Sequence, residues 1–228
     1  HGVHFIHGRA LPFATGIAMS RQDLDVFVFG GDGDAFSIGG NHFNHCARKN
    51  VNLTYVVMDN YVYGLTKKQT SPTSPIGFKS KTDMWGAVDK PINPIKQTIG
   101  AGATFVARTT HTNPKHLLAM MEAAMDHKGF GFIECLSECT EFYNGAFDSS
   151  NPRKGGEFRE VPEDHDPTDE IAAYELACEP VPGHFGIFYQ VDHPSKQDKE
   201  REINDKFLAK TGDMEDWEIL QQNFDKMK

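Results

Sequence analysis

Long apolar runs are absent from this 228-residue sequence, of which 39% is hydrophobic. No segment approaches the 18 or so uninterrupted apolar residues that a membrane-spanning helix needs. The first residues, HGVHFIHGRALP, have no initiator Met, no basic segment and no apolar core, so they are not a signal peptide. We expect a globular, non-membrane protein, and we interpret the chain as part of a longer protein whose upstream part is missing.

Cysteine and clustered basic residues are also scarce. None of the four cysteines forms a Cys-x-x-Cys pair, and a chain that can bury its own core needs no disulfide framework. A reducing, cytoplasmic setting is therefore predicted. Lys and Arg number 13 against 11 Asp and Glu over residues 1–140, and 10 against 21 over residues 141–228. This balance argues against nucleic-acid binding and predicts a solvated acidic C-terminal part.

Strand and helix patterns alternate over the first part of the chain, which predicts βαβ units. Near-continuous apolar strands are typical of a parallel sheet with helices on both faces. We expect strands over residues 24–30, 53–59, 104–110 and 131–137, and helices over residues 39–50 and 114–127. Residues 66–94 form a long loop of the kind that is usually functional.

The pattern weakens beyond residue 144. We therefore expect an α/β domain over residues 1–144 and an acidic C-terminal arm over residues 145–228 that contacts another subunit. Within this arm the sequence predicts a helix over residues 169–179, a strand over 185–191 and a charged helix over 196–210.

Two acidic residues occupy a glycine turn of the kind that usually binds phosphate. GGDGD at residues 30–34 follows the first strand, and 25 residues separate Gly33 from Asp59 and Asn60 at the end of the second. Ligands bind beyond the carboxyl ends of parallel strands, so Asp32 and Asn60 are expected side by side. Their oxygens suit Mg²⁺, which commonly keeps phosphate and water as its other ligands. A bound metal would turn the acidic turn into a diphosphate site.

Taken alone, GDG is also compatible with an ordinary strand-to-helix turn. A dinucleotide fingerprint would need a glycine where Phe36 stands. Zinc binding by His1, His4 and His7 is disfavoured, since no helix or carboxylate partner supports their spacing.

The spacing GDG, 25 residues, DN resembles the thiamine diphosphate and magnesium motif. Four segments in the same order are similar to the β subunit of 2-oxoacid:ferredoxin oxidoreductases, most of all the 2-oxoglutarate branch: HGRALPFATGIAMS, GGDGDAFSIGGNHF, MDNYVYGLTKKQTSPTSP and FIECLSECTEFYN. The resemblance implies a thiamine diphosphate-binding fold. It also implies coenzyme A-dependent oxidative decarboxylation of 2-oxoglutarate to succinyl-CoA, with electrons passing to ferredoxin.

The same resemblance assigns residues to the site. It implies that Mg²⁺ is bound by the side chains of Asp32 and Asn60 and by the main-chain oxygen of Val62. It places five residues around the cofactor: His7, Gly33, Asp34, Gly64 and Leu65. Gly64 would let the backbone approach the diphosphate closely, whereas simple packing is an equally good interpretation of Leu65.

Iron–sulfur and partner assignments also come from the resemblance. Cys139, in a Ser-Glu-Cys turn where the family has Ser-Pro-Cys, is implied as one ligand of a [4Fe-4S] cluster, with the other three upstream of His1. Cys46 and Cys135 are expected to be buried thiols. The glutamate that activates the cofactor belongs to an α subunit, so an αβ dimer or (αβ)₂ assembly is expected.

Three questions stay open from the sequence. The substrate can be pyruvate or another 2-oxoacid, and a non-redox thiamine decarboxylase or synthase would share the metal motif without the cluster cysteine. A non-catalytic binding module is a further alternative. Lys67 and Lys68 can contact the distal carboxylate of 2-oxoglutarate or steer an acidic ferredoxin, or belong to a solvated loop.

Overall fold

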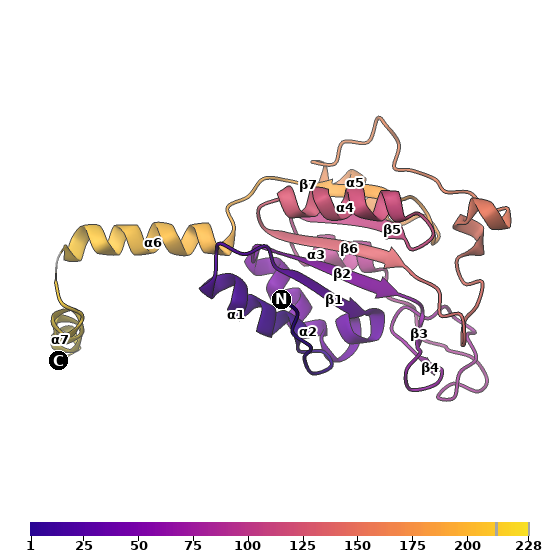
Figure 1. The fold of residues 1–228 in the computed structure, drawn as a ribbon, viewed down its shortest axis with the longest axis horizontal. Helices are drawn as coiled ribbons and strands as arrows, with labels where there is room; N and C mark the ends of the chain where they lie inside the picture. Colours follow the sequence, from indigo (N-terminus) through magenta and orange to yellow (C-terminus); the bar gives the residue numbers. More distant parts are fainter. Residues whose placement is uncertain (213, 228) are drawn as a thin grey trace.

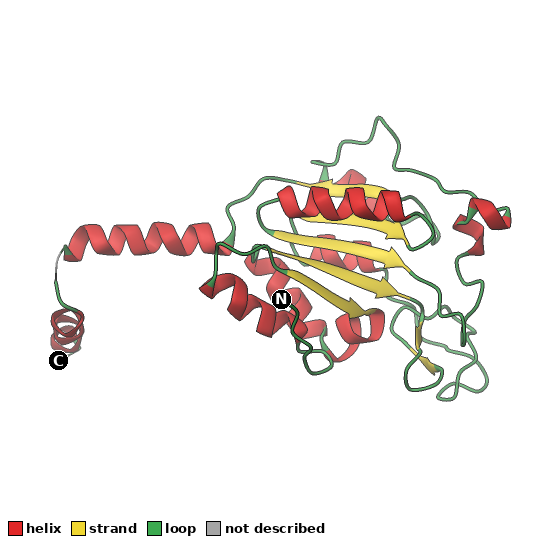
Figure 2. Ribbon diagram, viewed as in Figure 1, coloured by secondary structure: helices red, strands yellow, loops and turns green. Residues whose placement is uncertain are grey.

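The protein is built around one five-stranded sheet. The computed structural model describes residues 1–212 and 214–227, and its sheet has the strand order β1-β2-β6-β5-β7. Strands β1, β2, β6 and β5 run parallel to one another, whereas β7 runs antiparallel to β5. The strands are β1 (Phe27–Gly31), β2 (Leu53–Asp59), β5 (Phe105–Thr110), β6 (Phe130–Leu136) and β7 (Gly186–Gln190). The sheet is central in Figures 1 and 2, as the sequence predicts.

Helices cover both faces of the sheet. One face packs against the larger core cluster, which joins the strands to α1 (Ala10–Ser20), α2 (Gly40–Lys49), α3 (Pro94–Gly100) and α5 (Glu170–Leu176). The other face packs against α4 (Pro114–Asp126) through a smaller cluster around Val56, Phe105 and Ile133. This arrangement confirms the predicted α/β architecture.

Local sequence explains the ends of the predicted helices. Asn113 caps α4 by accepting a hydrogen bond from the backbone of His116, and Pro114 occupies the first turn, where a missing N–H costs little. Asn50 ends α2 with a φ of 52°, a left-handed conformation that asparagine tolerates better than most residues. Between β1 and α2 the chain forms a π-helical segment, η1 (Asp34–Ile38).

The C-terminal part contributes to the sheet and then leaves it. Strand β7 comes from this part and pairs with β5. The sheet therefore includes residues on both sides of the predicted boundary at residue 144. The division into two domains stays a prediction. Beyond β7, α6 (Lys196–Thr211) projects from the body and α7 (Asp216–Lys226) lies at its far end (Figure 1). Apolar side chains on both helices are exposed, among them Leu208 (60%) and Trp217 (67%).

The predicted long loop is confirmed. Between β2 and α3 the chain forms one short antiparallel pair, β3 (Val62–Tyr63) with β4 (Gln69–Thr70), and then irregular structure up to α3. Within the described ranges, no helix is long and apolar enough to cross a membrane.

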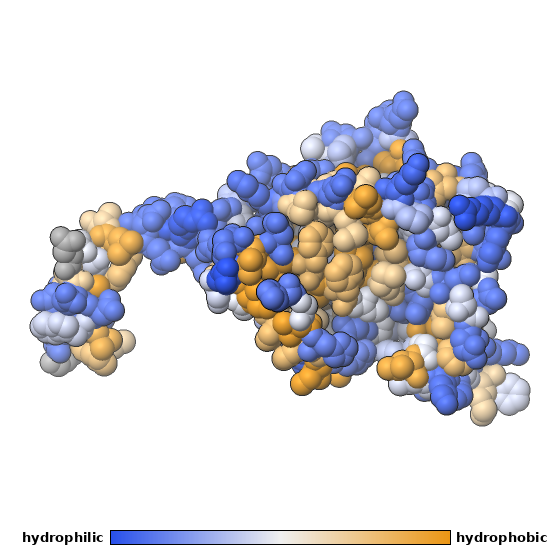
Figure 3. Space-filling model, in the orientation of Figure 1, coloured by the Kyte–Doolittle hydropathy of each residue, from blue (hydrophilic) through white to orange (hydrophobic). Residues whose placement is uncertain are grey.

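One face of the sheet is only partly covered. Figure 3 shows apolar side chains gathered beside α4, over the strands. Phe29 on β1 and Met58 on β2 are 57% and 37% exposed, and Leu118 on α4 is 57% exposed. Exposed apolar side chains that gather on one face often mark a contact with another chain.

Candidate metal and diphosphate site

The carboxyl ends of β1 and β2 bring two buried carboxylates together. Gly31 pairs with Met58 at the end of the β1–β2 ladder, so Asp32, just after β1, and Asp59, the last residue of β2, follow side by side. Asp32 is 2% exposed and Asp59 is fully buried. The backbone N–H of Asn60 lies close enough to stabilise the Asp32 carboxylate. The structure therefore brings the GDG turn and the Asp59–Asn60 pair together, as the sequence predicts.

Burial raises the pKa of both carboxyl groups. For Asp32, loss of hydration is the main cause, partly opposed by the hydroxyls of Ser71 and Thr73. The pKa of Asp59 is raised well above its usual value, first by burial and then by the charges of Asp32 and Glu134. Its Oδ2 atom has no hydrogen-bond partner among the described residues. Buried, unpaired carboxylates are costly unless a cation compensates them.

A threonine from the long loop lies between these carboxylates. The hydroxyl of Thr73 is 2.9 Å from Asp32 Oδ2 and 2.8 Å from Asp59 Oδ1. A hydroxyl has one proton to donate, so a single Thr73 side chain is shared between both acidic groups. Thr73 itself is 3% exposed.

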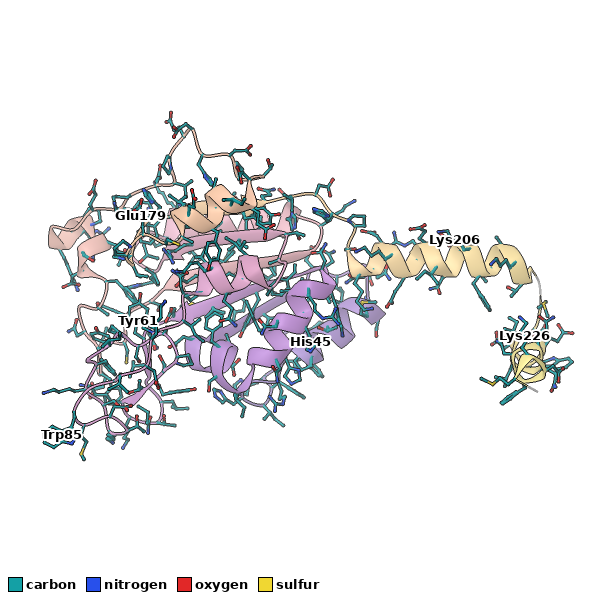
Figure 4. All side chains as sticks on the ribbon, turned by 180° about the vertical axis from the view of Figure 1, so that it is seen from behind. His45, Tyr61, Trp85, Glu179, Lys206 and Lys226 are labelled. Atoms are coloured by element: carbon teal, nitrogen blue, oxygen red, sulfur yellow. The ribbon has the colours of Figure 1, made fainter. Side chains whose placement is uncertain are left out.

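The turn after Asp59 is tightly bent. The backbone N–H of Tyr61 donates to Asp59 Oδ1 at 3.2 Å, and that of Val62 donates to Asn60 Oδ1 at 3.1 Å. Tyr61 has a φ of 63°, a conformation that is uncommon for a bulky residue and is often found at functional sites. Figure 4 shows Tyr61 where the sheet meets the irregular loops, with Trp85 far out on them.

Asp34 ties the N-terminal segment to the glycine turn. His7 Nδ1 is 3.0 Å from Asp34 Oδ1, and the backbone N–H of Gly8 donates to the same oxygen at 2.6 Å. Tyr55 donates its hydroxyl to Asp34 Oδ2 at 3.4 Å. Hydrogen bonding of His7 through Nδ1 leaves Nε2 free, and more than half of the His7 side chain is exposed.

The remaining predicted residues line the same edge. The Tyr63 hydroxyl donates to the carbonyl of Gly33 at 3.3 Å. A Cβ at Gly33 would meet the Tyr63 ring at 2.1 Å, so only glycine fits there without a shift of that ring. Gly64 faces Cys139, whose Sγ lies 3.4 Å from the position that a Cβ would take. Leu65 is 98% exposed, so packing within this chain does not explain it.

The cysteines separate by environment. Cys46 and Cys135 are buried, as predicted, and burial raises their thiol pKa values to about 11 and about 12. Cys178 is exposed and Cys139 is half-buried beside the Asp59–Gly64 turn. No group of three or more His, Cys, Asp or Glu side chains within residues 1–212 and 214–227 is placed to hold a metal.

A magnesium ion fits this site on chemical grounds. The predicted ligands comprise one carboxylate, one amide oxygen and one backbone carbonyl, which are the hard oxygens that Mg²⁺ prefers when phosphates complete its shell. Among the described residues no Lys, Arg or His forms an ion pair with Asp32 or Asp59. A bound cation would compensate the negative charge of these two carboxylates.

Comparison with known proteins defines the class of site. Residues 1–135 match the family model described as thiamine pyrophosphate enzyme, C-terminal TPP binding domain. A solved 2-oxoglutarate:ferredoxin oxidoreductase from Magnetococcus marinus, with 2-oxoglutarate, coenzyme A and succinyl-CoA bound, superposes with a TM-score of 0.85 at 39% identity. The match covers 95% of this chain and 73% of that one.

Curated relatives narrow the class. The 2-oxoglutarate oxidoreductase subunit KorB of Mycobacterium tuberculosis is 45% identical over 71% of this chain and 43% of its own length. The 2-oxoglutarate synthase subunit KorB of Archaeoglobus fulgidus is 48% identical over 60% and 51%. The chain belongs to the β subunits of the 2-oxoacid:ferredoxin oxidoreductases. It spans about half the length of the curated relatives that it matches.

Two features of the site escape the sequence pattern. Nothing in the spacing of TSPTSP singles out Thr73 from its neighbours, because the contact with Asp32 joins residues 41 positions apart. The left-handed backbone of Tyr61 has no signal in the sequence either, because such a conformation is usually marked by a glycine and this residue is a tyrosine. The density of Ser, Thr and Pro in residues 70–75 was the available hint, because such side chains commonly bind backbone groups in turns.

Proposed function

We propose that this chain is the thiamine diphosphate-binding subunit of a cytoplasmic enzyme that decarboxylates 2-oxoglutarate oxidatively, with coenzyme A as acyl acceptor and ferredoxin as electron acceptor. The observation that carries the proposal is the pair of buried carboxylates of Asp32 and Asp59 at the ends of β1 and β2, neither of which forms an ion pair with a basic side chain in the described part of the chain. The family membership and the likeness to the Magnetococcus marinus enzyme support the choice of substrate.

The chain's own residues would bind and orient the cofactor. Asp32, the Asn60 amide oxygen and the Val62 carbonyl would hold Mg²⁺, and the glycines at 33 and 64 would let backbone approach the diphosphate. In its protonated, imidazolium form, His7 would donate one ring N–H from Nδ1 to Asp34 and the other from Nε2 to a phosphate oxygen. When bound, thiamine diphosphate supplies the nucleophilic carbon and the electron sink for decarboxylation.

The proposal includes a partner and a cluster. An α subunit would supply the glutamate that activates the cofactor, and the exposed apolar surface around Phe29 and Met58 suits such a contact. Cys139, beside the cofactor turn, would be one ligand of a [4Fe-4S] cluster. The remaining ligands would be cysteines other than Cys46 and Cys135, which are buried.

Lys67 is the proposed contact for the distal carboxylate of 2-oxoglutarate. It is exposed beyond the metal site, and its backbone is held by a hydrogen bond to Gly64 at 2.9 Å. Replacing Lys67 with Ala should raise the KM for 2-oxoglutarate and leave that for pyruvate nearly unchanged. Equal changes in KM for both substrates would rule out this role of Lys67.

The function is tested on the complex of this chain with its partner subunit. Calorimetry with thiamine diphosphate and Mg²⁺ should show tight, metal-dependent binding, and steady-state assays should show 2-oxoglutarate- and coenzyme A-dependent reduction of ferredoxin. Binding without any redox activity would favour a non-redox thiamine decarboxylase or synthase. Absence of cofactor binding would indicate a non-catalytic module and overturn the proposal.

A further inference from the structure

One short turn of the long loop contacts both metal-binding segments. Residues 71–74, called the Ser71–Ser74 turn below, are closed by hydrogen bonds from Ser71 N to Ser74 Oγ (2.8 Å) and from Ser74 N to the Ser71 carbonyl (3.1 Å). The side chains of Ser71, Thr73 and Ser74 are all at most 5% exposed. The turn is therefore buried although the loop around it has almost no regular structure.

Each side of this turn reaches a different ligand segment. Thr73 contacts Asp32 beyond β1, at 2.9 Å, and Asp59 at the end of β2, at 2.8 Å. Ser74 donates its hydroxyl to the carbonyl of Tyr61 at 2.6 Å. Tyr61 stands between the proposed ligands Asn60 and Val62, in a left-handed conformation that needs support from its surroundings.

The turn is itself anchored to the body of the protein. The backbone N–H of Ile92, just before α3, donates to the carbonyl of Pro72 at 2.9 Å. Prolines at 72 and 75 flank Thr73 and Ser74 and restrict the backbone there. The backbone around Thr73 is therefore held in place by the fold, and this fixes the position of the Thr73 hydroxyl.

We propose that Thr73 and Ser74 are positioning residues for the magnesium site: Thr73 fixes the Asp32 carboxylate against Asp59, and Ser74 fixes the bend that presents Asn60 and the Val62 carbonyl. This inference rests on the proposed function. Groups that hold a metal ligand without touching the metal typically change metal affinity by about 10- to 100-fold when removed. The Ser71–Ser74 turn thereby links the long loop to cofactor binding.

The test compares Thr73→Val, which keeps the shape and removes the hydroxyl, with Thr73→Ser, which keeps the hydroxyl. In the complex with the partner subunit, Mg²⁺ is titrated calorimetrically at saturating thiamine diphosphate. Thr73→Val should weaken Mg²⁺ binding by about 10- to 100-fold, and Thr73→Ser should restore it to near the wild-type value. With Mn²⁺ in place of Mg²⁺, the electron paramagnetic resonance spectrum of Thr73→Val should show an altered ligand environment.

Thr98→Val is the matched control, because Thr98 is equally buried and its hydroxyl donates to the Pro94 carbonyl, away from the site. It should keep wild-type Mg²⁺ affinity even where it lowers thermal stability. Equal Mg²⁺ affinity of Thr73→Val and wild type would overturn the inference, as would equal losses in Thr73→Val and Thr98→Val.

If Thr73→Val does not fold, Ser74→Ala carries the test and should weaken Mg²⁺ binding in the same way. Wild-type Mg²⁺ affinity in that variant would overturn the inference. Failure of the wild-type complex to bind thiamine diphosphate is a different result, and it overturns the proposed function instead.

Discussion

The two ends of the parallel sheet handle buried polar groups in opposite ways. At the amino end, Asn50 Oδ1 accepts hydrogen bonds from Thr104 Oγ1 at 2.7 Å and from the Phe130 N–H at 2.8 Å. Its amide donates to two backbone carbonyls, and Thr104 also contacts His127 Nε2 at 2.7 Å. None of these side-chain atoms appears among the buried polar atoms without a partner in the described part of the chain.

The carboxyl end leaves buried atoms unsatisfied. Besides Asp59 Oδ2, the unpartnered atoms within the described residues include Arg108 Nη2 on β5 and Glu134 Oε1 on β6, each two residues before the end of its strand. Arg108 and Glu134 form a fully buried ion pair, with Nε 2.6 Å from Oε2, yet each keeps one free atom. Native structures rarely leave such groups unpaired without a reason. The buried polar side chains at the amino end satisfy one another, which favours stability, whereas the carboxyl end leaves buried atoms that a ligand can satisfy.

Replacing Asp32 with Asn should break the function of the carboxyl end without harming the fold. Thiamine diphosphate and Mg²⁺ binding, measured by calorimetry, should weaken by more than about a hundredfold, because a ligand is lost and not only its support. The metal-free protein should melt at the same temperature or higher, since a buried charge is removed. A lower melting temperature, or binding near the wild-type level, would contradict this account.

Replacing Asn50 with Ala should have the converse effect. Loss of the side chain leaves Thr104 and the Phe130 N–H with a missing partner and places alanine in a left-handed backbone. The free energy of unfolding, from urea titration, should fall by about 3 kcal/mol, while cofactor affinity in the folded complex stays unchanged. Asn44→Ala, on the exposed side of the same helix, should change stability by less than about 0.5 kcal/mol.

The amino end should also respond to pH through His127. Burial lowers the pKa of His127 below 6.5, so as pH falls below 6.5 the unfolded chain takes up a proton that the folded chain resists. Stability from this group is present above pH 6.5 and is lost as the pH falls through its lowered pKa. Urea titrations at pH 7.5 and 5.5 should show a smaller loss in His127→Gln than in wild type. An equal loss would show that His127 does not control the response.

The smallest expected effect is at the edge of the carboxyl end, where Lys67 and Lys68 have φ values of 71° and 72°. Glycine adopts this conformation freely, so Lys68→Gly should raise the free energy of unfolding by about 0.5–1 kcal/mol. Lys68→Ala keeps the strain and loses the contact of the ammonium group with the Phe78 ring, so it should not stabilise. Stabilisation by both substitutions would rule out backbone strain as the cause.

The periodicity of apolar residues and the positions of capping and turn residues predict the main strands and helices of this protein well. The structure confirms strand β2 over residues 53–59, the Asn113 cap and the long loop, because these follow from local residue preferences. The sequence places β1 too early, over residues 24–30 where the structure has Phe27–Gly31, because the Leu24 N–H is used in a turn, where it donates to the Arg21 carbonyl.

Tertiary contacts within the site have no such local signal. The meeting of Asp32 with Asn60 is predictable because parallel strands end at one edge. The insertion of Thr73 between Asp32 and Asp59, and the left-handed Tyr61, depend on how a loop without periodicity folds back on the sheet.

The most direct measurement is a crystal structure of the complex with thiamine diphosphate and Mn²⁺ in place of Mg²⁺. Anomalous scattering should locate one metal ion about 2.1 Å from Asp32, the Asn60 side-chain oxygen and the Val62 carbonyl, with diphosphate oxygens completing the shell. A metal bound elsewhere, or a cofactor bound with Asp32 and Asn60 turned apart, would contradict the account.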